Sequence, residues 1–287
     1  MATMIETAQT PKEAPQHKSG AAASTLTLES SERLSSGISL HTFSASNNCL
    51  ELLHPSGQLD LLFKEDLDPT RPARVESDRQ LTFTAAYLKR GDHDGNHQIM
   101  ILARNGRVTQ LLGLPRLQGP LQAEIISSGG GFSDETLNSL EGAICVASGT
   151  GLAPFLAMAS QKCPIKGAHL VWTINGNDFG AVEFLINSGM LKPEHWASVK
   201  VFVTSGEEAF GLIAGKAQSW WQNRFTELQG KLEGKVKFAC GRMSQDDLLN
   251  TQQESISQVL FCGNKSLEWQ VKMWFLSKAP VHTTSIV

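Results

Sequence analysis

A glycine-rich turn is the segment of this 287-residue chain in which residue types and spacing most clearly suggest chemistry. A hydrophobic run leads into SGTGLAP (148–154), which is followed by an apolar, alanine-rich stretch. A strand that ends in such a turn and opens a helix brings backbone N–H groups and the positive end of the helix dipole together, which suits a phosphate. Gly149 and Gly151 permit close approach of a ligand, Thr150 offers a hydroxyl, and Pro154 fits a first helical turn.

The spacing of this turn leaves its role open. It matches neither the GxGxxG fingerprint of dinucleotide-binding folds nor the GK[ST] ending of a P-loop. The residues alone therefore allow two interpretations, a phosphate-binding turn or a tight strand-to-helix turn with a purely structural role.

The bulk composition indicates a globular chain with room for two domains. Hydrophobic residues make up 41% of the chain and charged residues 18%, and no apolar run reaches membrane-spanning length, so we expect no membrane span. The net charge of -3 provides no broad positive field, which argues against nucleic acid as the main partner. Small molecules and redox carriers stay open as partners.

The cysteines and histidines give no metal-binding pattern. Five cysteines are widely spaced without a CxxC pair, so neither a zinc site nor a redox disulfide is expected. The GDHDGNH segment, with His93 and His97, is interpreted as a hairpin loop, so we expect no metal there. The N-terminus lacks a secretory signal and carries acidic residues that transit peptides avoid, which makes a cytoplasmic location the expectation.

Three stretches with different patterns divide the chain. Residues 1–36 are rich in Ala, Ser, Thr, Gln and Pro without apolar periodicity, which predicts a flexible tail. Residues 37–135 carry short apolar runs separated by turn residues, which predicts an antiparallel β-barrel domain. Over residues 140–287, strand-like runs alternate with helix-compatible segments, which predicts an α/β domain with a parallel sheet.

The expected elements of the second domain alternate regularly. The strands are expected at 143–147, 169–173, 199–204, 236–239 and 259–262. The helices are expected at 154–161, 181–188, 215–228, 244–250 and 266–276. The glycine-rich turn thus connects the first of these strands to the first of these helices.

The turn also resembles a known motif. With Phe155 it reads GTGLAPF, which is similar to the pyridine-nucleotide motif of the ferredoxin-NADP reductase family. In that family a flavin-binding β-barrel precedes a nicotinamide-binding α/β domain, the same domain order as predicted here. The resemblance implies that NADPH or NADH binds at Gly149, Thr150, Gly151 and Pro154, and that FAD binds at the barrel.

A second resemblance lies near the C-terminus. Cys262-Gly263, after the strand-like run 259–262, resembles the family's Cys-Gly-Pro turn beside the nicotinamide ring. The resemblance makes Cys262 the candidate catalytic residue, bordering the hydride path, and Gly263 a nucleotide contact. The other interpretation of Cys262 is a buried thiol at a strand end. Asn264 stands where proline is usual, and the chain ends in HTTSIV where relatives carry an acidic residue and an aromatic.

Two further strand ends are candidates for the adenosine side of the nucleotide. Thr204 and Ser205 follow one predicted strand, and Arg242 follows another. An arginine at such a position can bind a 2′-phosphate through two hydrogen bonds, which favours NADPH slightly over NADH. The alternative is that Arg242 caps a helix or that its side chain is solvated.

The flavin motif of the family is irregular in this chain. Its Arg-x-Tyr-Ser/Thr strand is compared with Thr70 to Ser77, where either Arg71 or Arg74 can take the place of the arginine. Neither alignment restores both the aromatic and the hydroxyl, so the ring would lack its usual contacts or the flavin would be absent.

Another flavin element is better preserved. Gly106-Arg107-Val108-Thr109 resembles the Gly-x-Val-Ser turn that holds the pyrophosphate through backbone amides and a hydroxyl. SSGGGF (127–132) resembles the segment that closes the barrel. A plain hairpin turn is the alternative for Gly106, Val108 and Thr109.

These features predict an NAD(P)H-dependent flavoprotein oxidoreductase that passes hydride through FAD to a small organic substrate or an electron carrier. The alternative is a reductase fold that has lost its flavin and serves as a small-molecule binding protein or a redox-neutral catalyst. The irregular flavin motif and Asn264 favour the alternative, whereas the well-preserved GTGLAPF motif favours the oxidoreductase.

Overall fold

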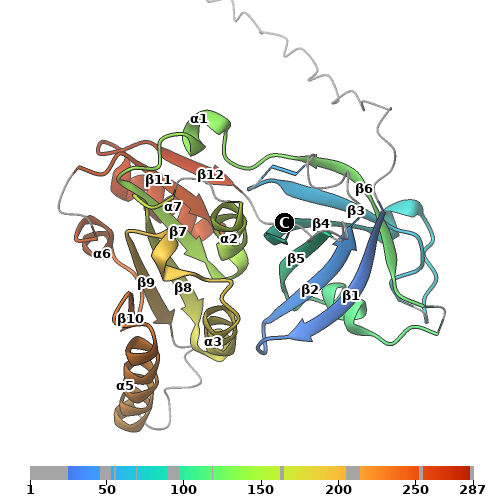
Figure 1. Cartoon of the computed structure of the whole chain (residues 1–287), viewed down its shortest axis with the longest axis horizontal. Coiled ribbons are helices and arrows are strands. Elements are labelled where there is room, and N and C mark those ends of the chain that lie inside the picture. The colour runs from blue at the N-terminus through green and yellow to red at the C-terminus, as the bar shows by residue number, and fades with distance from the viewer. Residues whose placement is uncertain are drawn as a thin grey trace, which may run out of the picture.

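A computed structural model describes two units that follow one another along the chain, a β-barrel and an α/β unit (Figure 1). It describes residues 25–45, 53–54, 56–68, 70–89, 97–117, 119–161, 165–204, 214–251 and 255–284. The predicted fold class is confirmed, because a closed antiparallel barrel precedes a parallel sheet flanked by helices.

Six strands close the barrel in the order β1-β2-β5-β4-β3-β6, and neighbouring strands are antiparallel. Their bounds are β1 Thr25–Arg33, β2 Ile38–Ala45, β3 Gln58–Phe63, β4 Gln80–Lys89, β5 His97–Arg104 and β6 Gln122–Gly129. Short 3-10 helices, η2 Glu76–Arg79 and η3 Thr109–Gly113, lie in the connections. Alternate side chains point inward, as Leu59, Leu61 and Phe63 of β3 show by their burial.

The tail predicted over residues 1–36 is wrong for its second part. Residues 25–33 form β1, which pairs with both β2 and β6 and so completes the barrel. Leu26 is fully buried in the barrel core, whereas the end of the strand, from Glu29 on, is exposed. The alternation of buried and exposed residues that predicts a strand is therefore confined to the first residues of β1. The Ser- and Glu-rich remainder of the strand lacks this alternation, so the sequence does not predict the strand. Residues 1–24 lie outside the described part of the chain.

The α/β unit has six parallel strands in the order β10-β9-β8-β7-β11-β12. Their bounds are β7 Ala143–Ser148, β8 His169–Asn175, β9 Ser198–Thr204, β10 Val236–Cys240, β11 Gln258–Cys262 and β12 Val281–Thr284. The helices are α1 Asp134–Leu137, α2 Ala153–Ser160, α3 Phe179–Asn187, α5 Ala214–Lys231, α6 Gln245–Leu249 and α7 Lys265–Phe275, with 3-10 turns η4 Gly149–Leu152, η5 Gly176–Asp178 and η6 Pro193–His195. The five predicted strands and five predicted helices of this unit are confirmed, and β12 is an addition.

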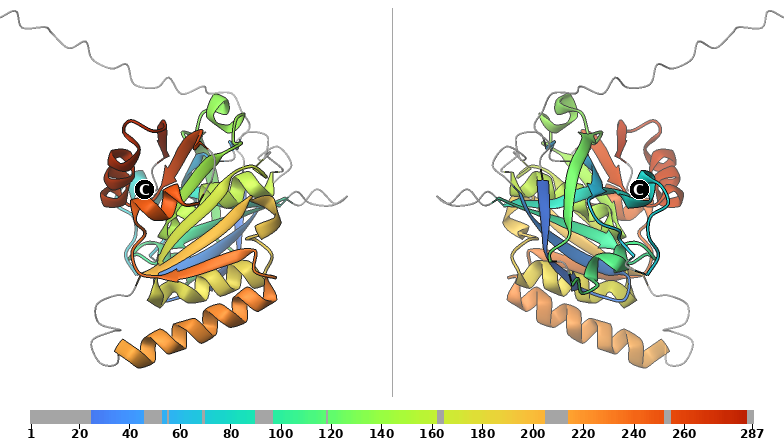
Figure 2. Two further views of the ribbon diagram at one scale, coloured as in Figure 1. Left: turned by 90° about the vertical axis from the view of Figure 1, so that its left-hand side faces the viewer. Right: turned by 90° about the vertical axis from the view of Figure 1, so that its right-hand side faces the viewer.

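Helices cover both faces of the parallel sheet (Figure 2). On one face α2, α3 and α5 pack over Cys145 and Trp172 in a single apolar cluster. On the other face α6 and α7 pack over Val146 and Phe261. Burial on both faces explains why these strands read as continuous apolar runs rather than alternating ones.

The barrel joins the core of the α/β unit. Four of its side chains belong to the same buried cluster as α2, namely Ile38, Leu40, Ala86 and Leu102. The linker residue Phe132 stacks on Phe155 of α2, with ring centroids 5.7 Å apart. The two units therefore share one continuous apolar interface.

Candidate functional site

A cleft of about 670 Å³ lies where the parallel strands end. Five residues predicted to bind the nicotinamide nucleotide line it: Gly149, Thr150, Thr204, Arg242 and Gly263. Thr204 ends β9 and the others follow β7, β10 and β11, and the carboxyl ends of these strands meet at the same edge of the sheet. The barrel closes the other side with Gly37, Ile38 and Arg104.

The cleft coincides with the topological switch point of the sheet. From β7 the chain proceeds through β8 and β9 toward one edge, whereas β11 pairs on the other side of β7 and continues to β12 at the opposite edge. Ligands of open α/β sheets bind beyond the carboxyl ends of strands at such a point. The GTG turn after β7 and the Cys-Gly turn after β11 flank this position.

These two turns are in direct contact, and glycine is required for it. A Cβ added to Gly151 would lie 2.1 Å from the carbonyl oxygen of Cys262. A Cβ added to Gly263 would lie 2.5 Å from Cβ of Ser148. Any side chain at either position would push the turns apart, so the two motifs form one packed unit.

Gly149 has a different role from its neighbours. Its φ is +56°, a conformation that favours glycine, and a Cβ built there meets no atom within 4 Å. The indole Nε1 of the buried Trp172 donates a hydrogen bond of 2.9 Å to the carbonyl oxygen of Gly149. The hydrogen bond from Trp172 thus fixes the backbone of Gly149, and the space beside its Cα is open toward the cleft.

Asn264 shows how the chain works without the proline usual at this place. Its Oδ1 accepts a hydrogen bond from the backbone N–H of Leu267 at 2.9 Å, which caps α7. Its Nδ2 donates to the Ser148 hydroxyl at 2.9 Å. The replacement therefore starts the helix and ties it to the end of β7.

Cys262 lies behind the cleft surface. Its side chain is fully buried, and burial, with a smaller contribution from Glu268, raises the pKa of the thiol to about 12. A neutral, enclosed thiol cannot act as a nucleophile at neutral pH. The structure thus gives Cys262 the buried strand-end position, and any part in catalysis would be through shaping the turn.

Of the other residues predicted to bind the nucleotide, three lie in or near the cleft and one lies outside the described residues. Pro154 is buried in the first turn of α2, behind the GTG turn. Thr204 donates its hydroxyl to the carbonyl oxygen of Ile174 at 3.2 Å, and Arg242 is exposed at the rim of the cleft. Ser205 lies outside the described residues.

One carboxylate connects the turn between β1 and β2 of the barrel to the sheet side of the cleft. Oδ1 of Asp178 accepts hydrogen bonds from the Ser35 hydroxyl at 2.7 Å and from the Gly37 N–H at 2.8 Å. The Ser36 hydroxyl is a third, longer donor at 3.4 Å. Because Gly37 and Asp178 both line the cleft, these bonds fix the barrel side of the cleft against the sheet side.

The flavin alignment based on Arg71 or Arg74 is not supported by the strand positions. Both arginines lie in the connection between β3 and β4, not in a strand. Arg79 ends η2, and the strand β4 begins directly after it with Gln80-Leu81-Thr82. Together these four residues fit Arg-x-Tyr-Ser/Thr at the first and last positions, with Leu81 in place of the aromatic. The start of the strand-like run at Leu81 was a signal that could have given this alignment from sequence.

The hydroxyl at the fourth position of this motif has a partner. Thr82 donates to Oδ1 of Asp60 at 2.6 Å, and the Ser127 hydroxyl donates to Oδ2 of the same carboxylate. Leu81 is half-buried against the barrel core. The ring side of a flavin site would therefore meet an aliphatic side chain and a hydroxyl already bound to a carboxylate.

Within the described residues, β4 is not paired with β5 along the part of the strand that carries this motif. Residues 80–84 of β4 pair with β3, but among the described residues β4 pairs with β5 only from Ala85 onward. The end of β5, Leu102 to Arg104, pairs with β2. The strands separate at the barrel end that carries Arg104, which lines the cleft.

The Gly106–Thr109 turn is ordered by its own threonine. The Thr109 hydroxyl donates to the Arg104 carbonyl oxygen at 2.7 Å and accepts from the Gly106 N–H at 2.8 Å. Val108 is 39% exposed at the beginning of η3. The turn therefore presents the start of a short helix to solvent, as an anion-binding turn would.

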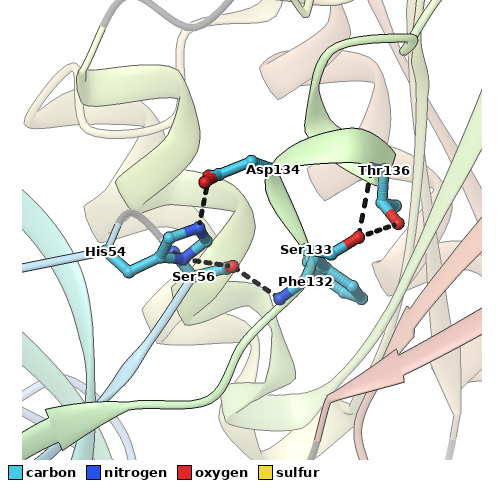
Figure 3. Close-up of polar contacts among 6 residues, drawn as sticks. All are labelled: His54, Ser56, Phe132, Ser133, Asp134 and Thr136. Atoms are coloured by element: carbon cyan, nitrogen blue, oxygen red, sulfur yellow. Dashed lines mark hydrogen bonds and ion pairs between the residues drawn. The ribbon is translucent and has the colours of Figure 1, made fainter.

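A serine, a histidine and an aspartate also meet at the linker between the units (Figure 3). Nδ1 of His54 is 3.1 Å from the Ser56 hydroxyl, and its Nε2 is 3.2 Å from Asp134. Ser56 is fully buried and its hydroxyl accepts the Phe132 N–H at 2.9 Å. A substrate could not reach this hydroxyl, so the contacts tether the linker to the barrel rather than form a nucleophilic triad.

The comparisons with known proteins agree on the fold. No protein-family model and no curated protein sequence matches the chain. Solved structures do match: the flavohemoglobin of Malassezia yamatoensis with bound FAD and heme has a TM-score of 0.56 at 13% identity, over 93% of this chain and 61% of that one. The chain has the ferredoxin-NADP reductase-like fold.

Two further reductase-like structures match to the same degree. The FAD/NAD-binding domain of nitric oxide dioxygenase from Vibrio cholerae has a TM-score of 0.56 at 9% identity, over 91% of this chain and 98% of that one. The ferredoxin reductase of carbazole 1,9a-dioxygenase has a TM-score of 0.56 at 13% identity, over 93% and 70%. At such identities the matches establish the reductase-like fold alone.

The described residues include neither a membrane-crossing helix nor a metal-binding cluster. No helix there combines the length and the apolar character that a membrane crossing requires. No group of three or more His, Cys, Asp and Glu side chains is placed to hold a metal ion in this part of the chain. Most of the GDHDGNH loop lies outside it.

Proposed function

We propose that the chain is an NAD(P)H-dependent flavin oxidoreductase whose nicotinamide nucleotide binds in the cleft at the ends of the parallel strands. The observation that carries this proposal is the packed pair of turns at the switch point, where Gly149 is open toward the cleft and Gly151 and Gly263 allow the turns to meet. The open geometry at Gly149 goes beyond what a purely structural turn requires.

Each wall of the cleft has a part in binding. The start of η4 and α2 offers backbone N–H groups and a positive helix end to the diphosphate. Arg242 from the sheet side and Arg104 from the barrel side add positive charge, and Arg242 is placed to discriminate NADPH from NADH. The Asp178 carboxylate binds no nucleotide in this account but holds the barrel wall in place.

The residues of the barrel fit a flavin's phosphates better than its ring. Arg79, at the end of η2, and the Gly106–Thr109 turn would supply a cation and the start of a short helix for the diphosphate, and the Arg79 guanidinium also donates to the carbonyl oxygen of Lys64 at 2.9 Å. Leu81 supports the ring only by apolar contact. A bound flavin would supply the acceptor for a hydride from NAD(P)H and pass the electrons to a substrate or carrier.

The nucleotide half is tested by a matched pair of glycine substitutions. Gly149 and Gly189 both have positive φ and both leave open space for a Cβ, but only Gly149 lines the cleft. Gly149→Ala and Gly189→Ala should each cost about 1 kcal/mol of stability. Only Gly149→Ala should weaken NADPH binding measured by calorimetry, by about tenfold, and equal affinities in both variants would rule out nucleotide binding at this turn.

A second candidate function keeps the fold without the redox chemistry. Leu81 in the aromatic position and the Thr82–Asp60 hydrogen bond favour a chain that has given up the flavin ring and uses the cleft for another organic ligand. Purified protein that neither takes up FAD nor oxidises NAD(P)H with artificial acceptors would favour this candidate. Saturable FAD binding would favour the oxidoreductase.

A further inference from the structure

Helix α7 carries more apolar side chains than the core uses. Val271 and Phe275 are fully buried in the cluster beneath the helix, and Leu267 and Trp274 pack against that cluster. A helix at the surface of a globular protein normally carries polar side chains on the side opposite to such a stripe. On α7, large apolar side chains occupy that outer side as well, so packing against the sheet does not account for the whole helix.

Three exposed side chains form one stripe on the outer side of α7, which we call the outer stripe. Trp269 is 64% exposed, Met273 50% and Leu276 77%. Spacings of four and then three residues place them one above another along the helix, as in the seam of a coiled coil. Single exposed hydrophobic residues are normal, whereas a contiguous exposed patch is typical of an interaction site. The helix that carries the stripe lies at the outside of the molecule (Figure 2).

The two flanks of the outer stripe differ. Lys265 and Lys272 lie along one flank, because residues seven positions apart share a side of a helix. The Lys272 ammonium is paired with Glu268 at 2.6 Å, so this flank keeps a net positive charge. Ser266 and Gln270 lie along the other flank, and both line the cleft. A partner bound on the outer stripe therefore stands at the mouth of the cleft.

A second copy of the chain fits the outer stripe poorly. Two α7 helices packed antiparallel would bring the lysine flank of one copy against the lysine flank of the other, and facing like charges are destabilising. The stripe is also small, because eleven residues of helix are about 16 Å long and about 10 Å wide. A stable interface buries about 800 Å² on each partner. The size of the stripe thus suits a transient partner.

A membrane surface fits no better. Ser266 and Gln270 lie directly beside the stripe at the rim of the cleft, so a flat bilayer against Trp269 would also cover the mouth of the cleft. Two lysines, one of them already paired with a carboxylate, provide little attraction for anionic lipid headgroups.

We infer that the outer stripe of α7 docks an acidic amphipathic helix of a partner protein at the mouth of the cleft. Apolar side chains of that helix cover Trp269, Met273 and Leu276, and its carboxylates pair with Lys265 and Lys272. The buried side of α7 fixes the stripe in place, so binding has to order only the partner. The inference holds whether or not the cleft binds NADPH.

The probe for this surface is a synthetic helical peptide with leucines spaced four and three residues apart and glutamates on both flanks. A length of about 20 residues lets it form a helix on its own. A second peptide carries lysine at every glutamate position. Fluorescence anisotropy of the labelled peptides measures binding to the full chain. The glutamate peptide should bind saturably, and the lysine peptide about tenfold more weakly, because like charges then face each other.

Two variants locate the binding on α7. W269S/L276S removes most of the apolar surface of the stripe and should weaken binding of the glutamate peptide about thirtyfold, because tryptophan anchors dominate interfaces of this kind. K265E/K272E reverses the charge of the flank and should reverse the preference, in favour of the lysine peptide. L117S is the matched control, because Leu117 is a fully exposed apolar side chain of the barrel, and it should leave both affinities unchanged. All the replaced side chains are exposed, so urea denaturation should give the midpoint of the unmodified chain for each variant.

The contradicting results are distinct from those that test the proposed function. The inference is wrong if the glutamate peptide does not bind, or if W269S/L276S binds it as tightly as L117S does. A dimer of the unmodified chain in sedimentation that is lost in W269S/L276S would assign the outer stripe to a second copy instead. Binding to vesicles of phosphatidylcholine and phosphatidylserine that is lost in the same variant would assign it to a membrane. NADPH and FAD titrations, which test the proposed function, are read independently of these results.

Discussion

At the scale of single residues, the contact between the two turns explains why position 151 is a glycine, which the motif sequence alone does not. Gly151 is buried and its missing side chain is replaced by the backbone of Cys262. The sequence alone suggested that this glycine makes room for a ligand, whereas the structure shows that it makes room for a second turn. Gly149 is the glycine that faces the cleft.

Gly151→Ala should therefore destabilise the fold. The new Cβ would overlap the Cys262 carbonyl oxygen, and overpacking of this kind costs about 1–3 kcal/mol of unfolding free energy. Gly230→Ala is the control, because Gly230 lies in α5 and a Cβ there meets no atom within 4 Å. That control should stabilise the chain by about 0.5–1 kcal/mol; urea denaturation measures both, and an equal effect in the two variants would contradict the packed-turn account.

His41 makes stability depend on pH. It is buried in the barrel wall with Nδ1 2.8 Å from the Ser31 hydroxyl, and burial lowers its pKa from 6.5 to about 4. Between these values the unfolded chain binds a proton and the folded chain does not, so stability falls as pH falls through this window, by about 3 kcal/mol. His41→Gln should flatten the acid side of a plot of unfolding free energy against pH, and an unchanged slope would show that His41 does not cause it.

At the scale of elements, the hairpin between β1 and β2 acts as part of the α/β unit. Asp178 receives its three hydrogen bonds, and Gly37 forms the rim of the cleft. This contact joins residues 141 to 143 positions apart in the chain, so no local pattern could have indicated it. The hairpin determines how far the barrel wall stands from the sheet.

Asp178→Ala should lower both stability and nucleotide affinity. The change leaves the Gly37 N–H without its acceptor, which costs about 1–3 kcal/mol, and it frees the barrel wall of the cleft. Asp178→Asn keeps an acceptor at Oδ1 and should stay close to the unmodified chain. Denaturation and NADPH titration measure the two effects, and an alanine variant that matches the asparagine variant in both would contradict this role.

The sequence predicted elements well where a single pattern decided them. Buried parallel strands such as β7 and β11 read as continuous apolar runs, and the helices between them followed. The start of the barrel was mispredicted because β1 is mostly polar and exposed beyond Leu28. The flavin strand was misaligned because Arg71 and Arg74 were the arginines considered, and both lie in the connection. Pairing with β3 shows that the strand begins at Gln80, directly after Arg79.

At the scale of the whole molecule, the two units share one apolar interface, whereas the barrel interior has a buried cluster of its own. Ile38 and Leu102 of the barrel belong to the cluster formed by α2 and the parallel sheet. The barrel residues that line the cleft, Ile38 among them, are therefore held in a fixed position against the sheet. The order of the units could be predicted from the sequence, but this shared interface could not.

The shared apolar interface predicts one cooperative unfolding transition. All six tryptophans lie at Trp172 or beyond, so their fluorescence follows the α/β unit, whereas circular dichroism follows both units. The two signals should change at the same denaturant concentration. Two separate midpoints would show that the barrel and the α/β unit unfold independently.

The central claim is that the chain joins an NAD(P)H cleft to a flavin site. An anaerobic titration of the FAD-reconstituted chain with NADPH tests it most directly. We expect the flavin absorbance to bleach in proportion to the NADPH added, because residues of the barrel and of the α/β unit line the same cleft. Protein that takes up no FAD, or that binds both FAD and NADPH while the flavin stays oxidised, would contradict the account.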